Sequence, residues 1–186
     1  MAAGFALFAQ GALAELPFKA GDRELTFEGS LREASVEARL EFDGGGSLAV
    51  SDDETRSLLT TGTFGYFLTD RHEVGVIAGV LWFDSDQGSD FDALAGLSYD
   101  FHWAKEGSAI VPVAGALVRT VMFDAIADYT YGVSGGFRVL AAHDISVNAR
   151  LYYEYTRAED AAFPGAELIV EQDDVGVRLG FSWMLR

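Results

Sequence analysis

Apolar and polar residues alternate along the C-terminal segment of the chain, and this alternation constrains the fold more than any other feature. The residues at every second position are small or polar, with Arg178 in the middle. Between them stand Val175, Val177, Leu179, Phe181, Trp183 and Leu185. Successive side chains of a β-strand point to opposite faces. The segment is therefore predicted to be a strand with one wholly apolar face.

Seven further segments are predicted to be strands, although two of them, 73–83 and 109–122, are apolar on both faces. In chain order the eight predicted strands are 23–31, 58–68, 73–83, 92–103, 109–122, 129–139, 145–156 and 175–185. The connections alternate between short turns and longer segments, which is typical of a closed up-and-down antiparallel barrel. The short turns are 69–72, 104–108 and 141–144, and the long loops are 33–54, 84–91, 124–128 and 158–174. The first long segment contains Gly44–Gly45–Gly46 between short alternating stretches, which also fits an extension of the first hairpin beyond the barrel rim.

The composition of the two faces predicts which one points outward. The polar face combines arginines with many glycines, whereas a strand surface in water normally carries polar side chains at almost every position, and glycine weakens it. Inside a narrow eight-stranded barrel, a glycine leaves room for a neighbouring arginine. Aromatic residues gather toward both ends of the apolar face, as they do at the two surfaces of a bilayer. We therefore predict an all-β membrane protein, an eight-stranded antiparallel up-and-down transmembrane β-barrel; the alternative is a soluble lipocalin-like barrel or β-sandwich.

Overall composition excludes several functional classes. The 186 residues suit a single domain, and 29 acidic residues against 13 lysines and arginines give a formal net charge of -16. This balance argues against nucleic-acid binding, which requires clustered positive charge. Because the chain has no cysteine, it has no disulfide, thiolate metal site or cysteine nucleophile.

The N-terminal segment Met1–Ala14 is uncharged and ends in the small-x-small pattern Ala12-Leu13-Ala14. This pattern indicates the end of a secretory signal, although the usual basic start is missing. We expect residues 1–14 to be a partial signal peptide and residues 15–186 to be the barrel domain. The alternative is a flexible or helical N-terminal extension.

The predicted strands and the signal-like start resemble small Gram-negative outer-membrane β-barrel proteins of the OmpA-transmembrane, OmpX and OmpW type. The stretch 65–75, Gly-Tyr-Phe-Leu-Thr-Asp-Arg-His-Glu-Val-Gly, resembles the turn between strands two and three of the outer membrane protein β-barrel domain families. The last strand resembles their assembly signal, with Arg178, Gly180, Trp183 and Leu185 in the signal positions. The chain departs from that pattern at Leu185-Arg186, where many members end in an aromatic residue. The resemblance implies residence in the outer membrane with both termini in the periplasm, and it implies as partners lipopolysaccharide and other outer-membrane lipids and the barrel-assembly machinery.

Charged residues on the predicted inner face are the main candidate site. Arg138, Arg150 and Arg178 lie on neighbouring strands, and Glu24, Glu28 and Glu154 lie within reach once the barrel closes. Unpaired charges are costly in a low-dielectric interior, so a hydrogen-bonded ion-pair network is expected. The network either fills the lumen and sets strand register, which we favour, or forms a polar gate for ions.

The acidic residues concentrate in the four long loops, which together with the adjoining Asp92 hold 19 of the 29. They indicate either a solvated, repulsive rim or a surface that binds divalent cations, lipopolysaccharide or a cationic partner. The acids Asp84, Asp86, Asp90 and Asp92 supply oxygen ligands suited to Ca²⁺ but lack a complete EF-hand pattern, so no metal and no cofactor are expected.

We expect a monomeric barrel with a structural, envelope-integrity or surface-interaction role and no catalysis. The alternatives are a narrow passive channel for small or hydrophobic solutes and, less favoured, a lipid-A-modifying enzyme. Such an enzyme needs an activated serine or a histidine with an orienting carboxylate. The three histidines, His72, His102 and His143, fall at the short-turn end, and none has a serine two positions away as the deacylases do.

Overall fold

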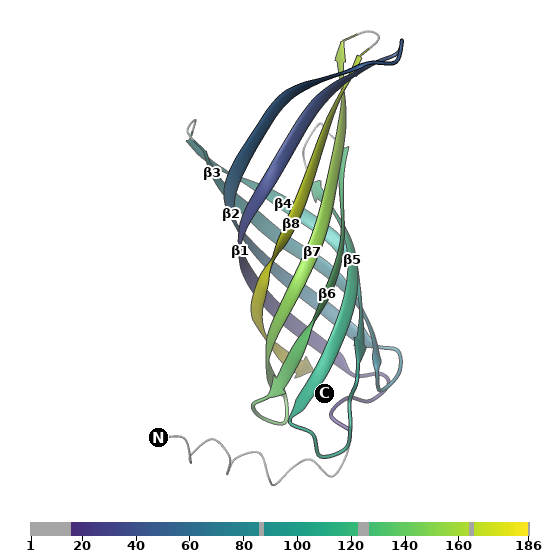
Figure 1. Cartoon of the computed structure of the whole chain (residues 1–186). Helices are drawn as coiled ribbons and strands as arrows, with labels where there is room; N and C mark the ends of the chain where they lie inside the picture. Colours follow the sequence, from purple (N-terminus) through teal and green to yellow (C-terminus); the bar gives the residue numbers. More distant parts are fainter. Residues whose placement is uncertain (1–15, 86–87, 123–126, 164–165, 186) are drawn as a thin grey trace.

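Eight antiparallel strands form the whole of the described fold in a computed structural model (Figure 1). The structure describes residues 16–85, 88–122, 127–163 and 166–185, and in some strand ends near the longer connections it describes the backbone only. The strands are β1 (Arg23–Phe42), β2 (Ser47–Phe67), β3 (His72–Ser85), β4 (Gly88–His102), β5 (Ile110–Met122), β6 (Ala127–Leu140), β7 (Ile145–Phe163) and β8 (Ala166–Leu185).

The sheet closes on itself because β1 pairs with both β2 and β8. Arg23, at the start of β1, lies opposite Tyr66 on one side and Leu185 on the other. Each remaining strand pairs with its neighbours in the chain, always antiparallel. The predicted eight-stranded up-and-down barrel is confirmed. Among the described residues, no helix is long and apolar enough to cross a bilayer.

The apolar face of each strand points outward. On β8, Val177, Leu179 and Phe181 are 51%, 60% and 53% exposed. On the opposite face, Arg150 and Arg178 are only 8% and 5% exposed. This arrangement agrees with the predicted orientation and contradicts the soluble-barrel alternative, in which the apolar residues would fill the interior.

Four strands are much longer than the sequence predicted. The segments 33–54 and 158–174, predicted as loops, belong mostly to β1, β2, β7 and β8, so the first hairpin does extend beyond the rim. Figure 1 shows these four strands rising together on one side of the barrel. We call the part of them formed by residues 33–54 and 158–174 the tall wall.

In the tall wall the outward face becomes polar, with residues such as Arg157 and Glu171. In 34–42 the alternation continues, but its apolar residues stand at even positions, whereas those of 23–31 stand at odd positions, so the two stretches do not form one pattern. In 166–174 the three apolar residues 168–170 are consecutive, and the alternation is lost.

The seam between β1 and β8 has one interruption. Pairing runs to Gly29, opposite Leu179, and resumes at Ser35, opposite Asp173. The register is the same on both sides of the gap, so the interruption is a local separation of the strands rather than a bulge. The outward Leu31 and Val175 lie within it and are 81% and 72% exposed.

Candidate functional site: the polar lumen

The lumen nearest the short turns contains a buried pair between strands far apart in the chain. Arg138 on β6 donates from Nη1 to Oε2 of Glu24 on β1 at 2.6 Å. Glu24 also accepts from the Thr26 hydroxyl at 2.6 Å. The second carboxylate beside this arginine is Glu73, 3.9 Å from Nη2 of Arg138. His102 shares a 2.9 Å hydrogen bond with Glu73 through its Nε2.

The middle of the lumen is held by Arg150 on β7. Its Nη1 donates to Oδ1 of Asp100 at 2.7 Å, and its Nε lies 3.5 Å from Oε1 of Glu28. Glu28 lies 4.0 Å from Nη1 of Arg178 on the other side. The carboxylate of Glu28 therefore connects two guanidinium groups on neighbouring strands.

The upper part of the network is centred on Glu154, which is 1% exposed. Its two carboxylate oxygens accept from Arg119 at 2.7 Å and from Arg178 at 2.6 Å. The guanidinium of Arg178 also stacks over the Tyr152 ring, 4.6 Å from its centroid. Charge-assisted hydrogen bonds and stacking of this kind offset the free-energy cost of burying an arginine.

Glycines on the inner face make this crowding possible. Gly136 on β6 lies opposite Arg150, and a Cβ at that position would overlap the carbonyl oxygen of Ala149 and lie 2.7 Å from the Arg150 Cα. Gly96 lies opposite Arg119 in the same way, with a built Cβ 2.6 Å from that of the arginine. The pairing of glycine with arginine, inferred from composition, is therefore present at individual positions.

An apolar stopper closes the short-turn end below the charges. Phe18, from the segment that precedes β1, is 1% exposed and stacks on Phe67 with ring centroids 4.8 Å apart. Its ring also contacts His102 at 4.9 Å and lies 5.1 Å from the guanidinium carbon of Arg138. Backbone hydrogen bonds tie the segment to β2, from Gly21 to Phe67 at 2.8 Å and from Phe67 to Asp22 at 2.9 Å.

A small cavity lies between the charged side chains. Its volume is about 40 Å³, and Glu28, Glu73, Asp100, Arg150 and Arg178 contribute to its walls. Each buried water needs roughly 10–15 Å³, so the cavity suits a few waters. Water there would serve buried polar atoms that have no hydrogen-bond partner among the described atoms, such as Glu28 Oε1 and Arg178 Nε.

The structure places all five sequence-predicted lumen residues on the inner face, in two adjoining groups. Ion pairs join Glu28, Arg150, Glu154 and Arg178. Arg138 instead pairs with Glu24, which the sequence also offered. Sequence reasoning missed Arg119, Glu73 and the role of Asp100. Arg119 stands in a segment apolar on both faces, where a lone arginine is the only signal, and Glu73 stood at the edge of a predicted turn.

The remaining sequence candidates are scattered. In the assembly-signal set, Arg178 faces the lumen, Trp183 faces outward and Gly180 packs against Phe27 and Glu28. Of the four weak metal candidates, Asp86 lies outside the described residues, as does the N-terminal segment 1–14. For Asp84 and Asp90 only the backbone is described, and Asp92 is partly exposed on β4.

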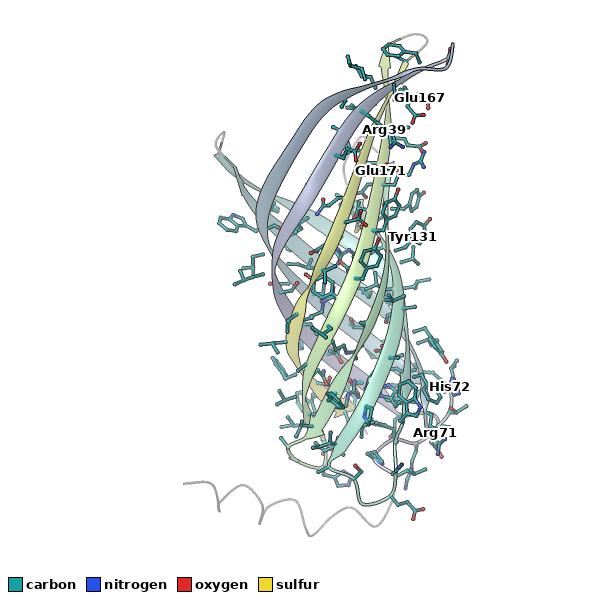
Figure 2. The ribbon with its side chains drawn as sticks, in the orientation of Figure 1. Arg39, Arg71, His72, Tyr131, Glu167 and Glu171 are labelled. Carbon is teal, nitrogen blue, oxygen red and sulfur yellow. The ribbon has the colours of Figure 1, made fainter. Side chains whose placement is uncertain are left out.

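The outer surface divides into bands along the barrel. On β8 the outward residues are apolar from Leu185 to Val175 and become acidic at Asp173. Aromatic residues occupy the change of character, and the Tyr153 hydroxyl donates to Asp173. Figure 2 shows Arg39 and Glu171 above this level, where Arg39 Nη1 lies 2.8 Å from Glu171 Oε2, and His72 and Arg71 at the opposite end. An apolar band between two polar zones is the surface that a bilayer requires.

Solved structures with this architecture are outer-membrane proteins. The crystal structure of the outer membrane protein OprG from Pseudomonas aeruginosa matches with a TM-score of 0.58 and 17% identity, over 91% of this chain and 98% of that one. The solid-state NMR structure of the outer membrane protein AlkL in DMPC bilayers matches with a TM-score of 0.52 and 17% identity, over 91% and 92%. No family model and no curated protein matches the sequence. The chain therefore has the fold of the small outer-membrane β-barrels.

Proposed function

We propose that this protein resides in the outer membrane of a Gram-negative bacterium as a barrel with a side-chain-plugged lumen. Its role is structural or interactive: it supports envelope integrity and presents the acidic tall wall at the cell surface. The observation that carries the proposal is the set of buried ion pairs that fills the lumen, from Glu24 and Arg138 near the short turns to Glu154 and Arg119 above. An eight-stranded barrel is only wide enough for side chains, and here large ones fill it.

Two features support a closed lumen independently of the ion pairs. The Phe18 stopper covers the short-turn end, and the cavity above it has room for a few waters rather than a solute. The orientation that fits the proposal has the short turns in the periplasm and the tall wall outside, because outer-membrane barrels carry short periplasmic turns and longer extracellular connections.

Single-channel recording in planar bilayers tests the plugged lumen. The expected result is a barrel that inserts, shown by heat-modifiable gel migration of the same sample, but gives no stable, reproducible openings. Reproducible openings of one size would contradict the proposal.

One observation favours a second candidate function, a narrow passive route for small or hydrophobic solutes. The β1–β8 pairing is interrupted between Gly29 and Ser35, beside two highly exposed aliphatic residues. A route of this kind would pass through the wall and would not need an axial pore. Uptake of a hydrophobic dye into proteoliposomes distinguishes the two candidates: uptake that stops when cysteines at positions 31 and 177 are cross-linked supports the route, and uptake no faster than in protein-free liposomes supports the plugged barrel.

A further inference from the structure

We propose that Glu73, Asp100 and His102 form a binding site for a divalent transition-metal ion such as Zn²⁺ inside the barrel. One ligand atom from each residue lies within 4.8 Å of the other two, although they come from two strands. Glu73 stands at the start of β3 and Asp100 and His102 at the end of β4, and the pairing of Glu73 with Asp100 brings them together. This site is independent of the proposed function and of the aspartates considered from the sequence.

The contact between His102 and Glu73 is the first argument. Nε2 of His102 and Oε2 of Glu73 lie 2.9 Å apart, and both atoms carry a lone pair unless a proton occupies the nitrogen. One proton on either atom makes this contact an ordinary hydrogen bond, and a metal ion bound by both atoms would take the place of that proton. An imidazole with two carboxylates is a donor set typical of zinc and related ions.

The charge distribution around the site is the second argument. Within the described ion-pair cluster, five carboxylates face four guanidinium groups. The carboxylates are Glu24, Glu28, Glu73, Asp100 and Glu154, and the guanidiniums are Arg119, Arg138, Arg150 and Arg178. Glu24, Asp100 and Glu154 each accept a hydrogen bond from an arginine. Glu28 lies 3.5 Å and 4.0 Å from two arginines, whereas Glu73 has a single one, Arg138, at 3.9 Å. The carboxylate beside His102 therefore has the weakest guanidinium contacts of the five.

The surroundings suit a bound ion. The imidazole is completely buried and held by ring contacts with Phe18 and Phe67, so its orientation is set by packing. The cavity walls include Glu73 and Asp100, so water could complete the coordination sphere from that side. Arg150 donates to Oδ1 of Asp100, and this hydrogen bond holds the carboxylate in place.

Metal analysis of the refolded full chain tests the proposal. The barrel is refolded in detergent with Zn²⁺ or Co²⁺, passed over a desalting column, and its folded fraction is measured by heat-modifiable migration. We expect about one ion per folded chain, visible d–d absorption bands for Co²⁺, and a rise in the unfolding midpoint that a chelator reverses. A folded wild-type chain that retains no ion from either metal overturns the proposal.

Matched variants locate the ion. His102→Gln and Glu73→Gln should each reduce bound metal at least about tenfold, since each removes one of three ligands. His72→Gln and His143→Gln, which alter the other two histidines at the same end of the barrel, should leave it unchanged. Loss of metal in these controls with retention in His102→Gln overturns the proposal. If His102→Gln does not fold, Asp100→Asn decides instead, because its amide oxygen still accepts from Arg150: altered Co²⁺ absorption supports the site, and an unchanged spectrum overturns it.

Discussion

Arg138 and Glu24 join β6 to β1 across the lumen, although 114 residues separate them in the chain. The two side chains are 1% and 0% exposed, and their 2.6 Å hydrogen bond lies directly above the Phe18 ring. A contact of this kind forms only when the barrel has closed, because β6 reaches β1 in the sheet through β7 and β8. The pair therefore reports closure and contributes to its stability.

Removing the charge of Glu24 should destabilise the barrel strongly. Glu24→Gln leaves the Arg138 guanidinium buried without its closest counter-charge, and breaking a buried pair from one side typically costs about 3–5 kcal/mol. Urea unfolding in lipid vesicles, followed by tryptophan fluorescence, measures the change. Glu106→Gln, in the exposed turn between β4 and β5, is the control and should change the unfolding free energy by less than about 0.5 kcal/mol. Equal changes in the unfolding free energy for the two substitutions would show that the Arg138–Glu24 pair does not stabilise the barrel.

Two adjacent glycines should respond oppositely to the same substitution. Gly136→Ala places a methyl group against the backbone of Ala149 and Arg150, an overpacking expected to cost at least about 1–3 kcal/mol. Gly135→Ala points outward, with its nearest atom 4.0 Å away, and should be neutral or slightly stabilising. The folded yield by heat-modifiable migration and the unfolding free energy measure both. A neutral Gly136→Ala would mean that the lumen is less tightly filled at this level.

The Phe18 stopper should contribute to the stability of the barrel, whereas the ion pairs above it should keep the lumen closed to ions. Phe18→Ala removes a buried ring that stacks on Phe67 and should cost about 3 kcal/mol, unless the freed segment detaches and limits the loss. Conductance should nevertheless stay as low as in the wild type, because the ion pairs above it remain. Leu68→Ala, at a half-exposed leucine of the same end, is the control for stability. Stable openings in Phe18→Ala alone would assign closure to the stopper instead of the charges.

Charge placed on the outer face should cost most at the middle of the apolar band. Leu179→Arg puts a guanidinium at mid-band on β8 and should destabilise by about 2–4 kcal/mol, whereas Val175→Arg, next to the acidic zone, should cost about 0–1 kcal/mol. The unfolding free energy in lipid vesicles is the measurement. A cost that does not depend on position along β8 would be incompatible with a bilayer around this band.

The sequence predicted those features that depend on side-chain alternation. Where one face meets hydrocarbon and the other meets the lumen, as in 175–185, the period-two pattern shows both the strand and its orientation. In the tall wall the outward face carries polar residues such as Arg157 and Glu171, so the pattern of an apolar outward face ends there and the strands were predicted too short. Phe18 was missed because it precedes the first strand and belongs to no repeating pattern. The partners of each arginine depend on strand register and barrel closure, which pairwise spacing in the sequence does not contain.

The central claim is the orientation of the two strand faces, and cysteine scanning along β8 tests it most directly. The chain contains no cysteine, so single cysteines at positions 175 to 182 can each carry a spin label in lipid vesicles. Accessibility to dissolved oxygen, which concentrates in the bilayer core, should alternate with period two, high at 177, 179 and 181 and low at 176, 178, 180 and 182. The opposite phase, or accessibility that does not alternate, would contradict a barrel whose apolar face meets lipid and whose arginines fill the lumen.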